Sequence, residues 1–219
     1  MRIVEPSFFI LQMPEGEQVL RHLELAARTC YKSEDKITPE SAKGLIRRIM
    51  QVGHESVLEH VGISVRIVCD RGISHELVRH RLASFSQEST RYANYSKEKF
   101  GQEITVIRPF FWAQDSPQYA LWLEAMHTAE RVYLAMLASG AKPQEARSVL
   151  PNSLKTEIVV TANLREWRHI FRLRCASPAH PQIRQIMLPM LADFYERIPV
   201  VFEDLYDMFE QDILAFDKG

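Results

Sequence analysis

Two runs of alternating hydrophobic residues constrain the fold of this chain more than any other feature. Mostly apolar side chains recur at every second position over Val61–Cys69 and again over Ser153–Asn163. A period of two belongs to a half-buried β-strand, whose successive side chains point to opposite faces. The sequence therefore predicts a strand in each run. A first strand within Met1–Met13 and a short one over Ile104–Ile107 are expected as well.

Helices account for most of the remaining chain. They are predicted over Glu17–Cys30, Pro39–Val52, Ile73–Arg81, Ser116–Ala138, Arg165–Leu173, Pro181–Arg197 and Val200–Phe216. Thr38 suits the N-cap of the second helix, Pro39 its first helical position and Gly53 its end. Because strands and helices are mixed without strict βαβ alternation, the predicted fold class is α+β, with a central, mostly antiparallel sheet and long flanking helices. No repeat, low-complexity tract or linker is visible, so residues 1–219 are predicted to form a single domain.

The long helix over Ser116–Ala138 presents a broad apolar surface. One face carries Leu121, Ala125, Val132 and Ala135, and a second stripe adds Trp122, Met126, Tyr133 and Leu137. Apolar residues at helical spacing usually pack into the core, and this is the interpretation that we favour. A helix–helix contact between subunits is the alternative.

Glycine spacing limits the kinds of nucleotide site that this chain can build. Only eight glycines are present, and no two lie within five residues of each other. A Rossmann fingerprint or a Walker P-loop needs closely spaced glycines, so that the backbone can approach a phosphate. Neither motif occurs in the sequence. Any nucleotide must therefore be held mainly by side chains or by helix ends.

Charge and cysteine content exclude further classes of protein. Lys and Arg number 27 against 28 Asp and Glu, which gives a formal net charge of -1. A protein that coats polyanions would be strongly basic, so that class is disfavoured. The three cysteines have no paired spacing and no signal peptide is visible, which indicates reduced thiols in a cytoplasmic protein. No apolar run approaches the ~18–20 residues that a bilayer-spanning helix needs.

The densest cationic feature is the triplet Arg79-His80-Arg81, followed by Arg91. The segment Ser84–Thr90 between them is rich in hydroxyl and amide groups. Guanidinium groups bind phosphate oxygens in bidentate fashion, and hydroxyls or amides can complete such a site. Three adjacent residues sweep about 200° of a helix and cannot share one face, so the triplet is expected at a helix end. A solvated basic helix end without a ligand is the alternative.

Metal binding and nucleophilic catalysis receive little support from the sequence. His54 and His60 lie six residues apart, about 240° around a helix, so both imidazoles would not face one ion. We therefore predict no metal site. The chain has no Gly-x-Ser-x-Gly elbow and no cysteine with an activating sequence context, and Ser89 is interpreted as a binding residue rather than an attacking one.

Together these motifs resemble the signature of the flavin-dependent thymidylate synthases, in which the triplet Arg79-His80-Arg81 is followed after seven residues by Ser89. Other segments resemble further blocks of the family in the right order. They are Gly53–Ser56 and Glu59-His60 upstream, and Arg147, Leu150-Pro151, Asn163–Arg165, His169 and Arg174 downstream. The resemblance spans residues 50–185, about the central two thirds of the chain.

The resemblance implies a homotetramer whose active sites lie between subunits, each with FAD. It implies conversion of dUMP to dTMP, with 5,10-methylenetetrahydrofolate as carbon donor and NADPH as ultimate reductant. The residues that it implies in FAD binding are Ser56, Arg79, His80, Arg81, Gln87, Asn163, Leu164, Arg165 and His169. Those that it implies in dUMP binding are Glu76, Leu77, Val78, Arg79, Gln87, Glu88, Ser89, Thr90, Arg91, Arg147 and Arg174. Arg174 is implied as the catalytic residue that activates the pyrimidine.

One position departs from the family pattern. Pro178 stands where members often carry a histidine, four residues after Arg174, and His180 lies two positions further on.

Two other functions are alternatives to a thymidylate synthase. The main alternative is a nucleic-acid-binding module that uses the basic cluster Arg79, Arg81 and Arg91, which the near-neutral charge disfavours. A noncatalytic oligomerisation protein built on the long helix is the third hypothesis.

Overall fold

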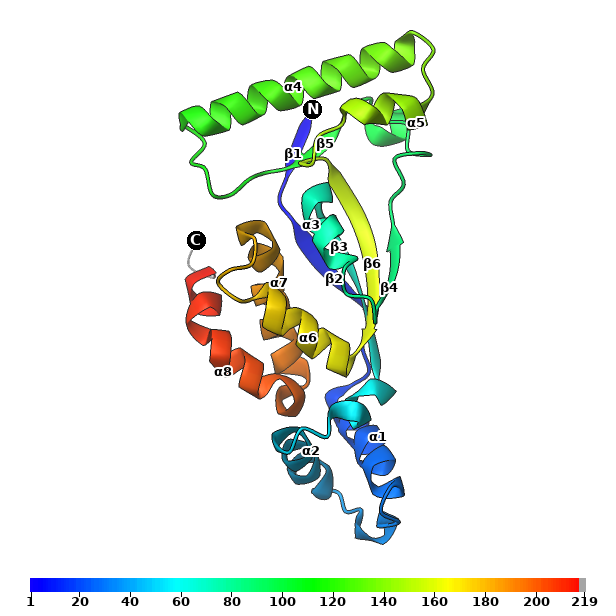
Figure 1. Cartoon of the computed structure of the whole chain (residues 1–219), viewed down its shortest axis with the longest axis vertical. Coiled ribbons are helices and arrows are strands. Elements are labelled where there is room, and N and C mark those ends of the chain that lie inside the picture. The colour runs from blue at the N-terminus through cyan, green and yellow to red at the C-terminus, as the bar shows by residue number, and fades with distance from the viewer. Residues whose placement is uncertain (217–219) are drawn as a thin grey trace. The chain divides into compact units, whose positions relative to one another are not determined.

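The structure is a computed structural model that describes residues 1–216, with the backbone alone at Lys99. Its strands are β1 (Arg2–Val4), β2 (Ser7–Gln12), β3 (Gly62–Asp70), β4 (Ser84–Gln87), β5 (Thr105–Ile107) and β6 (Lys155–Asn163). Its α-helices are α1 (Gly16–Thr29), α2 (Ser41–Gln51), α3 (Arg71–Leu77), α4 (Pro117–Ala138), α5 (Pro143–Ala146), α6 (Leu164–Arg174), α7 (Pro181–Arg197) and α8 (Pro199–Phe216) (Figure 1). Short 3₁₀ helices are η1 (Glu34–Lys36), η2 (Glu55–His60), η3 (Glu98–Phe100) and η4 (Arg147–Val149).

The strands form two sheets. The larger is antiparallel and has four strands in the order β2-β3-β6-β4, whereas β1 and β5 form a two-stranded parallel sheet. Backbone hydrogen bonds frame the pairing of β3 with β6, from Leu164 N–H to Val61 C=O (2.9 Å) and from Arg71 N–H to Leu154 C=O (3.1 Å). The predicted α+β class with a mostly antiparallel sheet is confirmed.

The described chain divides into two compact units. Unit 1 comprises Met1–Ser7, Ile67–Arg79 and Phe85–Val159, and unit 2 comprises Phe8–Arg66, His80–Ser84 and the described residues from Val160 onward. Each unit is thus assembled from three separate segments of sequence, and β3 and β6 contribute residues to both. The boundary falls inside the cationic triplet, after Arg79.

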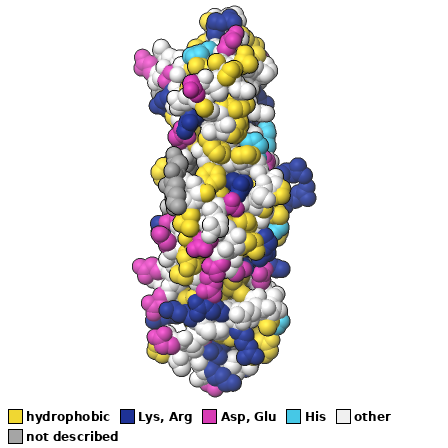
Figure 2. All heavy atoms as spheres, turned by 90° about the vertical axis from the view of Figure 1, so that its left-hand side faces the viewer, with side chains coloured by type: hydrophobic (Ala, Val, Ile, Leu, Met, Phe, Trp, Pro, Cys, Tyr) yellow, Lys and Arg dark blue, Asp and Glu magenta, His cyan; other side chains and the backbone are white. Residues whose placement is uncertain are grey.

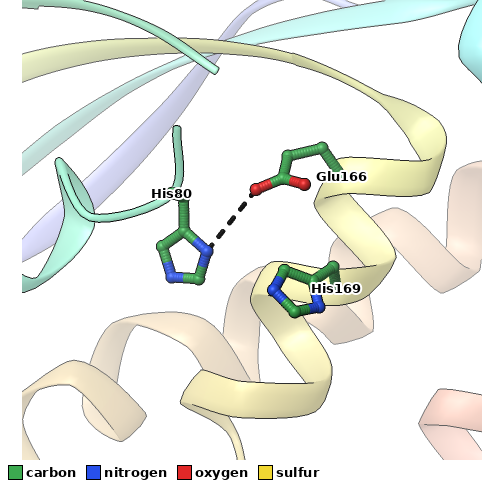
Figure 3. A group of neighbouring side chains, drawn as sticks. All are labelled: His80, Glu166 and His169. Atoms are coloured by element: carbon green, nitrogen blue, oxygen red, sulfur yellow. Dashed lines mark ion pairs between the residues drawn. The ribbon is translucent and has the colours of Figure 1, made fainter. Parts of the chain in front are cut away.

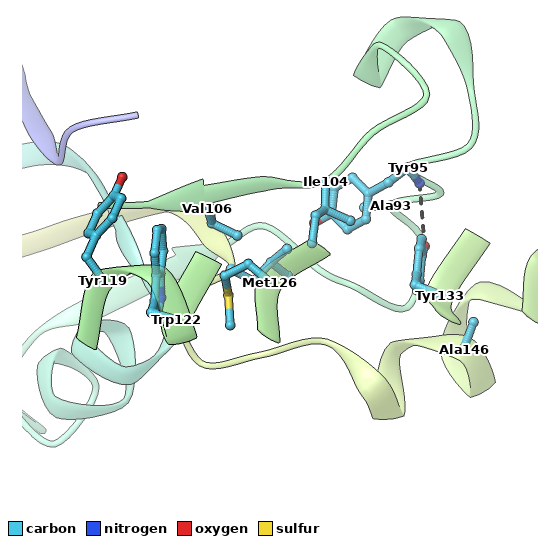
Figure 4. Packing of buried hydrophobic residues seen from close by; sticks show 10 residues of the cluster. Ala93, Tyr95, Ile104, Val106, Tyr119, Trp122, Met126, Tyr133 and Ala146 are labelled. Carbon is cyan, nitrogen blue, oxygen red and sulfur yellow. Dashed lines mark hydrogen bonds between the residues drawn. The ribbon is translucent and has the colours of Figure 1, made fainter. Parts of the chain in front are cut away.

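The core of unit 1 lies under α4. Trp122, Met126 and Tyr133 from this helix belong to one buried cluster with Ile104 and Val106, beside and within β5 (Figure 4). Two of these aromatic side chains also use their polar ends inside the unit. The indole N–H of Trp122 donates to Ser153 Oγ (3.0 Å), and the Tyr133 hydroxyl accepts from the backbone N–H of Tyr95 (3.5 Å).

The prediction that the other apolar face of α4 packs into this core is wrong. Leu121 is 68% exposed, and Ala125 is exposed too. These residues line an open hollow of about 470 Å³ together with Ala129, Val132 and Val149. The face with Trp122 and Tyr133 is buried instead. Only one face of the helix packs against the core, and large aromatic side chains whose polar groups are hydrogen-bonded occupy that face.

The core of unit 2 is built from aromatic rings on three helices. Trp167 and Phe171 on α6 contact Phe194 on α7, and Phe171 and Phe194 both contact Phe202 on α8, with ring centroids 5.2–5.9 Å apart. The Trp167 indole N–H donates to the carbonyl of Ile63 in β3 (3.1 Å). These contacts fix α6 firmly. Among the described helices, none combines the length and the apolar character that crossing a membrane requires.

The amino-terminal prediction of one strand within Met1–Met13 is wrong, because β1 and β2 are separate strands with Glu5 and Pro6 between them. Proline fixes φ and lacks the N–H that a continuous ladder needs. The start of α2 also differs from the prediction. The Ser41 hydroxyl accepts from the Thr38 N–H (2.8 Å) and donates to the Thr38 carbonyl (3.0 Å), which holds Thr38 and Pro39 in a turn before the helix.

Two helix ends show how far local sequence signals predict structure. Gly53 ends α2 as predicted, with φ +76, a left-handed conformation that glycine adopts without strain. The helix predicted over Ile73–Arg81 ends earlier, at Leu77, because the chain turns to enter β4. Strand β4 itself was not predicted, since its sequence Ser-Phe-Ser-Gln is short and mostly polar.

Candidate active site

The triplet Arg79-His80-Arg81 lies in the turns that follow α3. Asp70 caps the start of this helix by accepting from the Ile73 N–H (2.8 Å), which sets the direction in which the chain leaves β3. The side chains of Arg79 and Arg81 are exposed, whereas that of His80 is buried. The prediction that the triplet lies at a helix end is confirmed, and its three side chains occupy different environments.

In unit 1, Gln87 is held by a chain of hydroxyl groups. Its amide nitrogen donates to Ser74 Oγ (2.7 Å) and to Thr156 Oγ1 (3.2 Å), and the Ser74 hydroxyl in turn donates to the carbonyl of Arg71 (3.0 Å). Both amide hydrogens of Gln87 are therefore used inside the unit. A ligand that contacts this side chain must do so through Oε1.

The carboxylate and the backbone N–H of Glu88 both make polar contacts within unit 1. Its carboxylate accepts from the Tyr95 hydroxyl (3.2 Å) and pairs with Lys155 (3.3 Å), which also pairs with Glu157 (2.7 Å). Its backbone N–H donates to the carbonyl of Glu157 in β6 (2.9 Å). The pKa of Tyr95 is raised by burial first and by the Glu88 charge second, so its hydroxyl remains a hydrogen-bond donor. Glu88 therefore supports the segment that follows it.

The turn after Glu88 presents cations to solvent. The carbonyl of Ser89 accepts from the N–H of Tyr92 (3.1 Å), and Arg91 lies over the Tyr92 ring at 5.5 Å. Arg147, just after α5, donates to the buried hydroxyl of Thr90 (3.4 Å). The guanidinium groups of Arg91 and Arg147 are both exposed. Unit 1 thus brings Arg147 to the predicted segment 87–91, and the binding of dUMP by these residues stays a prediction.

In unit 2, Glu166 and His169 lie beside His80 (Figure 3), and Arg174 contacts it as well. Its Nδ1 lies 3.6 Å from Glu166 Oε1, and its ring meets that of His169 edge to face with centroids 5.7 Å apart. Its Nε2 accepts a hydrogen bond from Nε of Arg174 (3.0 Å). Glu166, His169 and Arg174 all come from α6, whereas His80 comes from the turn after α3.

The electrostatics of this cluster keep His80 neutral. Burial, then the Arg174 charge and then His169 lower the pKa of His80 to about 4. An arginine N–H can only donate, so Nε2 must be the unprotonated nitrogen of the imidazole. The proton of neutral His80 therefore lies on Nδ1, toward Glu166. Burial also raises the pKa of Glu166 above its ordinary value.

His80, Glu166 and His169 offer a set of donor atoms that a metal ion could use, since these atoms lie within 4.8 Å of one another. The hydrogen bond from Arg174 argues against such a site. With Nε2 occupied by the arginine and the proton on Nδ1, neither nitrogen of His80 has a lone pair for a metal. The adjacent guanidinium charge would also repel a cation. The prediction of no metal site stays a prediction.

The start of α6 is tied to η2 by ion pairs. The Asn163 side chain ends β6 and caps α6 by accepting from the Glu166 N–H (2.9 Å). Arg165 pairs with Glu59 (2.5 Å), which brings η2 and its exposed residue Ser56 to this helix end. Arg168, on the same helix, is buried and makes a bidentate pair with Asp204 on α8 (2.7 Å).

The predicted residues divide between the two units. Those in unit 1 are Glu76, Leu77, Val78, Arg79, Gln87, Glu88, Ser89, Thr90, Arg91 and Arg147. Those in unit 2 are Ser56, His80, Arg81, Asn163, Leu164, Arg165, His169 and Arg174. The side chains of Leu77 and Leu164 are buried in the core, so only their backbone groups are suited to contact a ligand.

Sequence reasoning missed several residues that hold these groups in place. Ser74 and Thr156 position Gln87, Lys155 holds Glu88, and Glu166 faces His80. Of these residues, Glu166 alone had a local signal. It is an acid three residues after the helix cap Asn163, and acids are common there because a negative charge interacts favourably with the positive end of the helix dipole. Its partner is 86 positions earlier in sequence, which no local pattern reveals.

A family model described as thymidylate synthase complementing protein matches residues 11–200. The chain belongs to this family. Among the chain's relatives, a flavin-dependent thymidylate synthase of Geobacter sulfurreducens is 35% identical over 82% of the chain and 79% of that relative. One from Corynebacterium aurimucosum is 36% identical over 84% and 79%, and one from Pyrococcus abyssi is 37% identical over 76% and 68%.

A solved structure shares the fold of this chain. A crystal structure of the UMP/dUMP methylase PolB from Streptomyces cacaoi bound with 5-Br dUMP matches with a TM-score of 0.77 and 24% identity, over 95% of this chain and 98% of that one.

On the face shown in Figure 2, Lys and Arg side chains are interspersed with Asp and Glu side chains rather than gathered into one stripe. The family shown is the one that the sequence motifs resemble, and this favours the thymidylate synthase hypothesis over the nucleic-acid-binding module.

Proposed function

We propose that this protein is a flavin-dependent thymidylate synthase, which methylates dUMP to dTMP with FAD as redox cofactor. The observation that carries the proposal is the 35–37% identity to relatives of that name over most of the chain. In this reaction 5,10-methylenetetrahydrofolate donates the carbon and NADPH is the reductant. The chain thus acts as one thymidylate synthase-like domain over residues 1–219.

The segment 87–91 and Arg147 bind dUMP in this proposal. A nucleoside monophosphate carries a dianionic phosphate, and the exposed guanidinium groups of Arg91 and Arg147 suit it. Arg147 is oriented by the buried Thr90 hydroxyl, and the turn at Ser89 is held in place by the anchored Glu88. Gln87 adds a fixed amide whose Oε1 is an acceptor for an N–H of the ligand. Arg79, Glu76 and the backbone of Leu77 and Val78 complete the set.

FAD is held by exposed polar groups rather than by a glycine-rich loop. Arg81, Arg165, His169 and Ser56 are exposed in unit 2, and the capped N-terminus of α6 favours an anion such as a diphosphate. The donor set of unit 2 therefore suits a dinucleotide, with His80, Asn163 and Leu164 as its further contacts in that unit. When bound, FAD carries the reducing equivalents that the methylation consumes.

Arg174 activates the pyrimidine. Methylation at C5 of uracil needs negative charge to build up on the ring, and a cation at the N3–C4=O4 edge stabilises that charge. Arg174 is partly buried at the end of α6, and its Nε is fixed by His80. A guanidinium with a fixed plane stabilises the developing charge without first reorganising. No covalent enzyme nucleophile is needed, and burial raises the pKa of the Cys69 and Cys175 thiols, which makes them unreactive.

The assembly in this proposal is a homotetramer with active sites shared between subunits. The exposed apolar face of α4, with Leu121 68% exposed, is the support for a subunit contact. The three cysteines are all free thiols, and this supports a reducing compartment, the cytoplasm.

A flavin titration of the purified chain tests the proposed function. FAD is added first, then dUMP, while the flavin absorbance is recorded, and NADPH oxidation and dTMP formation are followed after methylenetetrahydrofolate is supplied. The proposal expects FAD to bind, dUMP to perturb its spectrum, and dTMP to form only in the complete mixture. A chain that binds no FAD, or that binds it and makes no dTMP from dUMP, contradicts the proposal.

A further inference from the structure

We propose that Glu166 is a positioning residue of the reaction, which acts through His80 to fix the guanidinium group of Arg174. The inference rests on the proposed role of Arg174. It concerns a residue that no motif of the sequence singles out, and all of its members, Glu166, His80 and Arg174, belong to unit 2.

The first link is the hydrogen bond from Arg174 Nε to His80 Nε2, at 3.0 Å. The bond exists only while Nε2 carries a lone pair, because a guanidinium group stays protonated and can only donate a hydrogen bond. A guanidinium is planar, so fixing its Nε–H direction also fixes the directions of its two terminal nitrogens. The tautomer of His80 therefore decides whether this bond to Arg174 can form.

The second link is the carboxylate of Glu166, whose Oε1 lies 3.6 Å from Nδ1 of His80. This distance is longer than a hydrogen bond, so the carboxylate acts on the Nδ1 proton chiefly through its charge. The side chains of His80 and Glu166 are only 3% and 7% exposed, so water neither screens this interaction nor replaces it. The charge favours the imidazole tautomer with the proton on Nδ1, the same relation that a buried aspartate has to histidine in a catalytic triad.

The third link is the rigidity of α6. The backbone N–H of Glu166 is bound to the Asn163 cap (2.9 Å), and Trp167 and Phe171 pack the helix into the aromatic core. Glu166 in its first turn and Arg174 at its end are thus fixed on one helix, with His80 beside the Glu166 carboxylate (Figure 3) and hydrogen-bonded to Arg174. The Glu166–His80–Arg174 chain is therefore a preorganised support for a catalytic side chain.

Kinetics of Glu166→Ala and Glu166→Gln in the FAD-loaded protein test the consequence. Loss of a supporting group of this kind typically costs roughly 10–100-fold, so Glu166→Ala is expected to lower kcat for dTMP formation by about that factor. KM for dUMP stays within about threefold, because the phosphate contacts are untouched. Glu166→Gln keeps the shape of the side chain but removes its charge, so it is expected to lower kcat about as much as Glu166→Ala does. The matched control is Glu24→Ala, which removes a buried acid of the same unit that pairs with Arg28 and leaves kcat unchanged.

Nitrogen NMR of the histidine-labelled protein reads the tautomer directly. The inference expects Nδ1–H for His80 in the wild-type chain, and a mixture of tautomers in Glu166→Gln and Glu166→Ala, which both lack the charge. The wild-type measurement needs no variant to fold. An Nε2–H tautomer in the wild type, or unchanged kcat and tautomer in Glu166→Ala, overturns the inference.

A zinc titration separates the inference from a metal site on the same residues. Zn²⁺ added to the wild-type chain is expected to leave the His80 and His169 signals unmoved. Stoichiometric binding that shifts both and is lost in Glu166→Ala overturns the inference in favour of a metal site. A wild-type chain that makes no dTMP contradicts the proposed function instead, and the tautomer measurement then still judges the link between Glu166 and His80.

Discussion

The segment 87–91 with Arg147 in unit 1 and the His80 cluster in unit 2 use the same residue types in opposite surroundings. In the first, Arg91 and Arg147 are exposed and are oriented by a ring contact and a single hydroxyl bond. In the second, the imidazole and carboxylate are almost fully buried, and each polar contact is fixed by helix α6. One region offers charge to solvent, whereas the other offers fixed geometry.

The difference teaches where binding and chemistry are expected to reside. Exposed guanidinium groups attract an anion over a distance and are screened by salt, so they suit the capture of a phosphate. A buried and neutral imidazole costs little to desolvate and holds its neighbour in one orientation, so it suits the stabilisation of charge in a transition state. Substitutions in the first region should therefore change KM, and those in the second should change kcat or stability.

The largest effect is expected for Arg174→Ala. It removes the cation proposed to stabilise charge on the pyrimidine, and kcat for dTMP formation should fall by roughly 10²–10³-fold. FAD should still bind, because the exposed contacts in unit 2 remain, and flavin absorbance after desalting checks this. Arg172→Ala is the matched control, since Arg172 is exposed on the same helix. Near-normal turnover of Arg174→Ala would break the assignment of chemistry to the buried region.

Asp204→Ala tests whether the stability of unit 2 depends on an ion-pair partner for the buried charge of Arg168. It leaves Arg168, whose side chain is 3% exposed, without its bidentate partner. Breaking such a pair costs 3–5 kcal/mol when both partners are buried, and Asp204 is half exposed, so we expect a loss of about 3 kcal/mol of unfolding free energy. Urea unfolding measures it, with Arg47→Ala, which breaks an exposed pair to Glu203, as the milder control. Equal losses in both variants would contradict the expectation.

The pH dependence of stability tests the neutral state of His80. Its pKa in the folded chain, about 4, lies below the ordinary 6.5, so the unfolded chain binds the proton more readily. The contribution of neutral His80 to the free energy of unfolding is fully present above about pH 6.5. It is lost as the pH falls toward 4, and the free energy of unfolding drops by about 2 kcal/mol between pH 7 and pH 5. His80→Gln, which cannot titrate, should lose less stability over the same range. Parallel urea-unfolding curves for the two proteins would refute the burial of a neutral imidazole.

The smallest of these effects is expected for Arg147→Ala, in the exposed region. Losing one phosphate contact should raise KM for dUMP about tenfold, roughly 1.4 kcal/mol, with kcat nearly unchanged. The increase should shrink at high ionic strength, because salt screens exposed charges. Arg131→Ala, an exposed arginine on α4, is the control. A fall in kcat without a change in KM would sharpen the comparison by assigning Arg147 to the chemical step.

Local patterns in the sequence determined most of the elements and the family. The alternation over Val61–Cys69 predicted β3 because a half-buried strand leaves a period of two, and Ile63, Val65, Ile67 and Cys69 are indeed fully buried. The triplet at a helix end followed from helix geometry alone. The spacing of Arg79-His80-Arg81 and Ser89 was sufficient to indicate the family that the comparisons then showed.

Tertiary structure decided which of two equivalent faces is buried and which partner each polar group finds. The two stripes of α4 have similar hydrophobicity, and only packing turned Trp122 inward and left Leu121 exposed. Arg168 and Arg174 share a helix and a residue type, yet one is paired with Asp204 and the other is bonded to His80. Local sequence fixes backbone periodicity, whereas burial and hydrogen bonding depend on residues that are distant in the chain, so no pattern within α6 could reveal the state of its arginines.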